Sequence, residues 1–136
     1  GAFCADEAPL LGLVSVMAPA LALGNRVVLA ASTPFPLAAT DFFQVLETSD
    51  VPAGVVNILT GDARDLAQPM AAHMNLDAVW SFSSSDLSKT IEAASALNLK
   101  RTWVNNGTAF DWSLDHSRTF LQQATEVKNI WVPYGE

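Results

Sequence analysis

Short apolar runs alternate with segments of helical periodicity along most of this chain, and this alternation restricts its fold more than any other feature. The runs lie at residues 26–31, 55–59, 77–82 and 100–104, and most of them are rich in Val, Leu, Ile or aromatic residues. Buried strands of a parallel sheet have this composition because helices cover both of their faces. The order therefore predicts an α/β fold with a doubly wound, mostly parallel sheet.

The helical segments carry start and stop signals at their ends. Pro9 suits a first helical turn, and Gly24 with Asn25 suits the end of the same helix. Ser84 or Ser85 suits the N-cap of a later helix. We therefore expect a short strand at 2–6, helices at 9–23, 37–46, 62–74, 86–97 and 118–125, and a last strand at 126–132 that no helix follows.

Composition and charge narrow the classes of function. The 136 residues suit one domain with its own core. A net charge of −7 repels a phosphate backbone, so nucleic acid is not an expected partner. The chain has one cysteine, Cys4, and no run of 18 or more apolar residues. We expect a soluble, cytoplasmic protein with no internal disulfide and no membrane partner.

Two motifs lie on the turns of the first two strand and helix units. Residues 19–29 read P-A-L-A-L-G-N-R-V-V-L, and residues 52–61 read P-A-G-V-V-N-I-L-T-G. They resemble the A-P-A-L-x-x-G-N-x-V-V-L and P-x-G-V-V-N-I-x-T-G motifs of the aldehyde dehydrogenase superfamily. Residues 77–89, D-A-V-W-S-F-S-S-S-D-L-S-K, are similar to a third family segment, D-x-I-x-F-T-G-S-x-x-V-G-x. The ending E-V-K-N-I-W-V-P-Y-G at 126–135 resembles the last strand of the family.

The resemblance implies how the chain is organised. It implies a nucleotide-binding-type domain of the Rossmann-like kind over residues 1–110, and a tail over 111–136. It also implies that Gly61, Ser83 and Ser84 lie where the family binds its nucleotide. The family's last strand joins a sheet of a neighbouring subunit, so the tail is expected to form an interface. The expected interface residues are Trp112, Val127, Ile130, Trp131 and Val132.

The residues at the family's chemical positions differ from the family motifs. Glu7 lies in the W-N-F-P segment that stabilises an oxyanion in the family, and a carboxylate there repels negative charge. Ala30 and Thr33 occupy the lysine and glutamate positions that hold the ribose. Ser83 replaces a glycine that allows close approach of the pyrophosphate. Asn105 stands for the glutamate of E-L-G-G-K, and an amide takes no proton at neutral pH.

The family's nucleophilic cysteine follows E-L-G-G-K, and no cysteine follows Asn105 here. Cys4 lies far upstream and is interpreted as a small buried residue. We therefore expect no catalytic residue and no cofactor in this domain, with NAD or NADP used by a parent enzyme. The chain is interpreted as the truncated C-terminal second copy of a long aldehyde dehydrogenase resembling family 16. Its expected role is assembly with the remainder of that enzyme or with a second subunit; the alternative is a weak NAD or nucleotide-binding module.

Three other candidate sites have little support. His73 and His116 have no second ligand at metal-binding spacing, so no metal site is expected. An acid, a serine and a histidine occur together at 111–117, but no glycines of a nucleophile elbow flank either serine there. The serines at 83–85 suit an N-cap better than a phosphate cradle, and the cradle is kept as the alternative interpretation.

Overall fold

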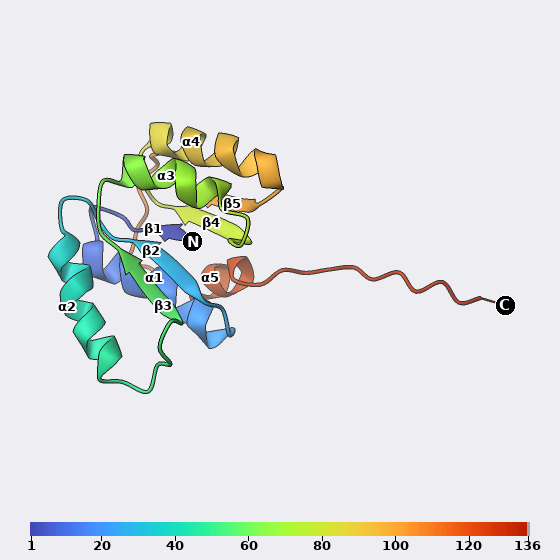
Figure 1. The fold of residues 1–136 in the computed structure, drawn as a ribbon, viewed down its shortest axis with the longest axis horizontal. Coiled ribbons are helices and arrows are strands. Elements are labelled where there is room, and N and C mark those ends of the chain that lie inside the picture. The colour runs from blue at the N-terminus through green and yellow to red at the C-terminus, as the bar shows by residue number, and fades with distance from the viewer. Residues whose placement is uncertain (136) are drawn as a thin grey trace.

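A five-stranded sheet with helices on both faces forms the body of the molecule (Figure 1). The computed structural model describes residues 1–135. The strands are β1 (Ala2–Phe3), β2 (Val27–Ala30), β3 (Val56–Leu59), β4 (Ala78–Ser81) and β5 (Arg101–Val104). Their spatial order is β3-β2-β1-β4-β5, and every neighbouring pair is parallel. The predicted doubly wound α/β fold is confirmed.

The helices divide between the two faces of this sheet. They are α1 (Pro9–Ala22), α2 (Pro36–Glu47), α3 (Ala63–Ala72), α4 (Ser85–Ser95) and α5 (Ser117–Gln123), and a short 3-10 helix (Ala96–Asn98) follows α4. Helix α1 packs with α2 and α5, and α3 packs with α4 on the opposite face (Figure 1). The helices that connect β1 to β3 therefore form one layer together with α5, and the helices that connect β3 to β5 form the other.

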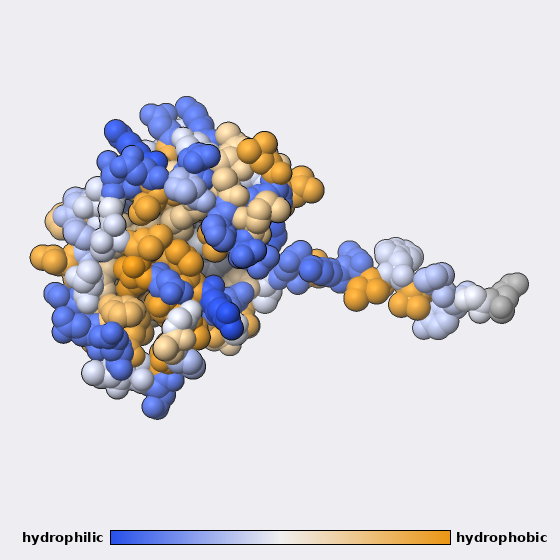
Figure 2. Space-filling view, in the orientation of Figure 1, coloured by the Kyte–Doolittle hydropathy of each residue, from blue (hydrophilic) through white to orange (hydrophobic). Residues whose placement is uncertain are grey.

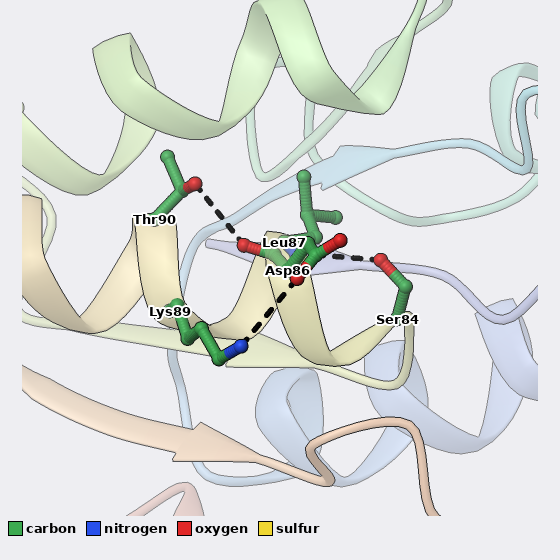
Figure 3. Close-up of polar contacts among 5 residues, drawn as sticks. All are labelled: Ser84, Asp86, Leu87, Lys89 and Thr90. Atoms are coloured by element: carbon green, nitrogen blue, oxygen red, sulfur yellow. Dashed lines mark hydrogen bonds and ion pairs between the residues drawn. The ribbon is translucent and has the colours of Figure 1, made fainter.

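Helix starts follow local chemistry that the sequence displays. Pro9 and Pro36 occupy first-turn positions, where a missing N–H costs no hydrogen bond. The Asp62 carboxylate accepts from the Arg64 N–H at 2.9 Å and caps α3. The Ser84 hydroxyl accepts from the Leu87 N–H at 3.3 Å, so Ser84 is the N-cap of α4 (Figure 3).

The start of α4 is completed by two exposed contacts on its first turns (Figure 3). Lys89 Nζ lies 3.5 Å from a carboxylate oxygen of Asp86, and the Thr90 hydroxyl donates to the Asp86 carbonyl at 3.1 Å. An ion pair this exposed contributes little to stability. The Ser84 cap therefore matters more for the position of this helix start than the ion pair does.

Two apolar clusters fill the space between the sheet and its helices. Leu13, Val16 and Leu29 belong to the cluster under α1 and α2. Phe3, Val79 and Ile91 belong to the cluster under α3 and α4. Side chains of β1, β2 and β4 alternate between the two clusters, as the pleat of a strand requires. Apolar side chains thus cover both faces of the central strands. This packing holds the strands, and with them the strand ends, in place.

The chain after α5 differs from the sequence prediction. Residues 126–132 form no strand in the described part of the chain, and they extend from α5 away from the sheet (Figure 1). The predicted strand is therefore wrong for this single chain. A strand is defined by hydrogen bonds to a neighbouring strand, and this segment lies beside none. Within the described residues, no helix has the length and apolar character needed to span a membrane.

Candidate functional site

A cavity of about 720 Å³ opens at the carboxyl ends of the strands. The loop after each of the five strands contributes at least one polar residue to its wall, and these include Asp6, Thr33, Asp62, Ser83 and Asn105 in chain order. From β1 the chain adds β2 and β3 toward one edge of the sheet, and it then crosses back to add β4 and β5 toward the other edge. The cavity lies between β1 and β4, where this order of connection switches. Ligands of open α/β sheets bind at such points, which makes this cavity the candidate site.

The structure brings the predicted nucleotide-site residues to this cavity. Ser83 and Ser84 line it, and Gly61 precedes the lining residue Asp62. The hydroxyl of Ser83 is hydrogen-bonded to that of Ser81, and Ser84 caps α4. Both serine hydroxyls are therefore engaged by the protein itself.

Thr33 and Ala30 are the residues that the sequence motif matches to the family's ribose-binding positions. The Thr33 hydroxyl donates to the Gly61 carbonyl at 3.3 Å and accepts from the Ala63 N–H at 3.1 Å. It ties the loop after β2 to the loop after β3. Ala30 is 1% exposed within the core and carries no polar group. Neither residue supplies a free group toward the cavity.

Asn105 ties the loop after β5 to the start of α4. Its Oδ1 accepts from the Ser83 N–H at 3.1 Å, and its Nδ2 donates to the Thr108 carbonyl at 2.8 Å. Gly107 has a φ of 75°, and a Cβ there would lie 3.1 Å from the Ser85 nitrogen. Only glycine combines this backbone conformation with so close an approach. Asn105, which the sequence motif matches to the family's general base, is a structural tie in this chain.

Glu7 makes a second such tie on the other side of the cavity. Its carboxylate accepts a hydrogen bond from Trp112 Nε1 at 3.3 Å. The Trp112 ring packs against Phe82, with ring centroids 5.0 Å apart. The structure thus places Trp112 against the body of the molecule, apart from the other four predicted interface residues. Hydrogen bonds of Glu7 and Asn105 thus help to hold the polypeptide after β5 on the body of the domain.

An aromatic cluster completes this attachment, and the sequence reasoning missed it. Phe82 lies at its centre with ring-centroid distances of 4.9–5.8 Å to Trp103, Phe110, Trp112 and Phe120. Phe120 on α5 is 3% exposed, so the helix of the predicted tail is part of the body. The available signal was the density of aromatic residues between 103 and 120.

Cys4 is buried and unsuited to nucleophilic chemistry. Its side chain is 6% exposed in the cluster under α1. Burial, with a smaller contribution from the negative charge of Asp6, raises the pKa of the Cys4 thiol to about 12. Because the thiolate is the reactive form of cysteine, a thiol with this pKa is inert at neutral pH.

The acid, serine and histidine at 111–117 form a turn. The Ser113 hydroxyl donates to the Asp111 carboxylate at 2.6 Å, and this hydrogen bond holds the pKa of Asp111 below its usual value. His116 Nε2 contacts the Asp111 backbone carbonyl at 2.9 Å. Because His116 is not bonded to a serine, the group lacks the geometry of a catalytic triad. Among residues 1–135, no group of three or more metal-binding side chains occurs.

Comparisons of this chain with known proteins agree with this architecture. Residues 2–111 match the model of the aldehyde dehydrogenase family. The chain belongs to the aldehyde dehydrogenase family. It is 39% identical over 101 residues to an aldehyde dehydrogenase of Agaricus bisporus, which covers 73% of this chain and 20% of the relative. It is 35% identical over 100 residues to human aldehyde dehydrogenase 1A1, with the same coverage.

Solved structures of aldehyde dehydrogenases share the fold. The aldehyde dehydrogenase of Bartonella henselae matches with a TM-score of 0.73 and 28% identity, covering 76% of this chain and 22% of that one. Indole-3-acetaldehyde dehydrogenase of P. syringae, solved with NAD+ and IAA, matches with a TM-score of 0.72 and 33% identity, covering 76% and 21%. The chain spans about a fifth of the length of these aldehyde dehydrogenases.

The charge of the cavity wall disfavours the dinucleotide that the aldehyde dehydrogenase fold implies. Its wall carries the carboxylates of Asp6, Glu7 and Asp62 against one cation, Arg64. A pyrophosphate carries two negative charges, so the net field of this wall opposes it. The hydroxyls of Thr33 and Ser83 are already bonded within the protein. No catalytic step through the dinucleotide is therefore assigned to this chain.

Replacing Asn105 by alanine is expected to destabilise the domain by about 1–3 kcal/mol, because the part-buried Ser83 N–H loses its acceptor. Urea unfolding followed by circular dichroism measures this change. Asn129→Ala in the exposed tail is the matched control and leaves stability unchanged. An Asn105→Ala protein as stable as the parent would show that the tie carries no weight.

Proposed function

We propose that this chain is a non-catalytic assembly domain of a larger, NAD-dependent aldehyde dehydrogenase. The observation that carries the proposal is the use of Glu7 and Asn105, at the family's oxyanion and base positions, as intramolecular ties. The inert thiol of Cys4 supports it further. We infer that the chain is the truncated C-terminal copy of a two-copy enzyme resembling family 16, a pseudoenzyme domain located in the cytoplasm.

The tail supports an assembly role. Val127, Ile130, Trp131 and Val132 lie in an extended segment and are 67–93% exposed. Large apolar side chains gathered on one protruding segment mark an interaction surface. Segments that are extended and unpaired associate with other proteins by adding a strand to an exposed sheet edge. The partner in this proposal is the remainder of the parent enzyme or a second subunit, through oligomerisation by this tail.

Removing residues 126–136 is expected to abolish self-association and to leave the fold intact. The deletion spares the Arg101 contact to the Thr125 carbonyl and the Phe120 packing, so the body keeps its core. Analytical ultracentrifugation across a concentration series measures the change, with thermal melting as the control for folding. If the 136-residue chain sediments as a monomer at every concentration, as the truncated chain does, the result would contradict self-association through the tail.

A second candidate is a weak nucleotide-binding module. The position of the cavity at the switch point, beside the N-terminus of α4, favours it. Isothermal titration with NAD+, NADP+ and ADP distinguishes the two candidates. Saturable heat that is lost in Ser84→Asp would support nucleotide binding, because a fourth carboxylate in the cavity wall repels phosphate. A flat titration with all three nucleotides would remove this candidate.

A further inference from the structure

The free edge of β3 carries an apolar groove. β3 is the outermost strand of the sheet next to β2. Two adjoining cavities of about 330 and 410 Å³ share Phe43 and Val56 and follow the strand from one end to the other. We call the surface formed by Thr40, Phe43, Val56, Ile58 and Leu59 the edge groove. Figure 2 shows hydrophobic residues gathered where Figure 1 places β2 and β3.

The backbone of β3 also offers hydrogen-bonding groups at this edge. The Val27 N–H donates to the Val55 carbonyl, and the Ala31 N–H donates to the Leu59 carbonyl. In a parallel strand the backbone N–H and C=O of alternate residues point to opposite sides. The N–H and C=O of Val56 and of Ile58 therefore point away from β2. An edge with outward peptide groups and an apolar groove beside it is a template for an added strand.

The tail has the complementary properties. Its backbone is extended over residues 126–135, and Trp131 and Tyr134 are 93% and 98% exposed. Its two charged residues within 126–135, Glu126 and Lys128, lie 3.8 Å apart as an ion pair, so this segment carries no net charge. The complementarity of the tail to the edge groove therefore lies in its extended backbone and its exposed apolar side chains.

The position of the tail favours pairing between two chains. The Thr125 carbonyl, where the tail begins, accepts from Arg101 on β5 at 2.8 Å, so the tail starts beside the opposite edge of the sheet. Four strand spacings of about 4.8 Å, or roughly 19 Å, separate that edge from β3. The tail extends away from β3 of its own chain in Figure 1.

We propose that the tail of one chain adds as a strand to the β3 edge of a second copy, with its aromatic side chains in the edge groove. This inference rests on the proposed assembly function and names the docking site. Two such contacts related by a twofold axis form a closed dimer. Burying Trp131 and Tyr134 of both tails covers about 600–1,000 Å², and the aliphatic side chains and backbone extend this toward the standard interface of about 1,200–2,000 Å².

The test blocks the β3 edge in the full chain. Ile58→Pro removes one outward N–H, a change that edge strands tolerate, and Leu59→Glu places a carboxylate in the groove from a residue that is already 36% exposed. Thr102→Pro is the matched control, because its N–H points outward from β5 at the opposite edge. Sedimentation equilibrium measures the mass, and circular dichroism confirms folding.

The parent chain and Thr102→Pro are expected to sediment at twice 14.5 kDa, and Ile58→Pro and Leu59→Glu at the monomer mass, with Kd at least tenfold higher. Leu59→Glu decides the result if Ile58→Pro does not fold. Folded edge variants that remain dimeric would overturn the β3 site, and dissociation by Thr102→Pro alone would do the same. If deleting the tail still yields monomers in that case, the assembly function stands and only the docking site is wrong.

Discussion

Replacement of Phe82 by alanine is expected to lower the free energy of unfolding by about 3–5 kcal/mol. Phe82 is 2% exposed and lies between β4 and the segment that returns after β5. Its ring contacts Trp103 of β5, Trp112 of the return segment and Phe120 of α5. Truncation leaves a cavity that the rigid aromatic neighbours fill poorly. The loss of unfolding free energy is therefore expected at the upper end of the range for core substitutions.

Urea unfolding followed by tryptophan fluorescence and circular dichroism measures the Phe82→Ala effect. Phe35→Ala is the matched control, because the Phe35 side chain is 55% exposed and its loss is expected to change stability by about 0.5 kcal/mol or less. A Phe82→Ala protein within about 1 kcal/mol of the parent would show that the return segment packs elsewhere.

The Cys4 thiol is expected to react with iodoacetamide on the order of 1,000-fold more slowly in the folded chain than in the unfolded chain at pH 8. The pKa rises from 9.0 to about 12 on folding, and the thiolate fraction falls tenfold for each unit. The neutral thiol is the form that folding favours. The contribution of this thiol to the free energy of unfolding is therefore fully present below pH 9 and is lost as pH rises from about 9 toward 12.

Mass spectrometry of alkylated protein measures this rate, with the chain in concentrated urea as the reference. Introduction of a second thiol by Ser113→Cys in the exposed turn provides the internal control, because an exposed thiol reacts at the ordinary rate. Alkylation of Cys4 as fast as the introduced cysteine would contradict the buried, neutral state of the thiol.

The body of the fold follows from local sequence signals. Buried runs such as residues 26–31 and caps such as Asp62 and Ser84 act within a few residues, so their structure is readable from the chain alone. The segment at 126–132 shows the opposite case. Its apolar residues predict a strand, but strand formation depends on a neighbour that one chain does not supply. Residue pattern alone does not reveal that dependence.

The candidate site was predictable in position and less so in its contacts. Residues after consecutive parallel strands converge at one edge, which places Thr33, Ser83 and Asn105 together. The bonds between Glu7 and Trp112, and between Asn105 and Ser83, join residues 105 and 22 positions apart. Such contacts depend on the final packing of loops, and no local pattern encodes them. The use of Glu7 and Asn105 as structural ties was therefore visible only in the structure.

An assay of aldehyde-dependent NADH formation tests most directly the proposal that this chain is a non-catalytic domain. The isolated chain is incubated with NAD+ and a panel of aliphatic and aromatic aldehydes, and NADH absorbance is followed with time. A trace equal to that of buffer is expected, because Cys4 is a buried neutral thiol and Asn105 takes no proton. An aldehyde-dependent rise that scales with protein concentration and disappears in Cys4→Ala would contradict it.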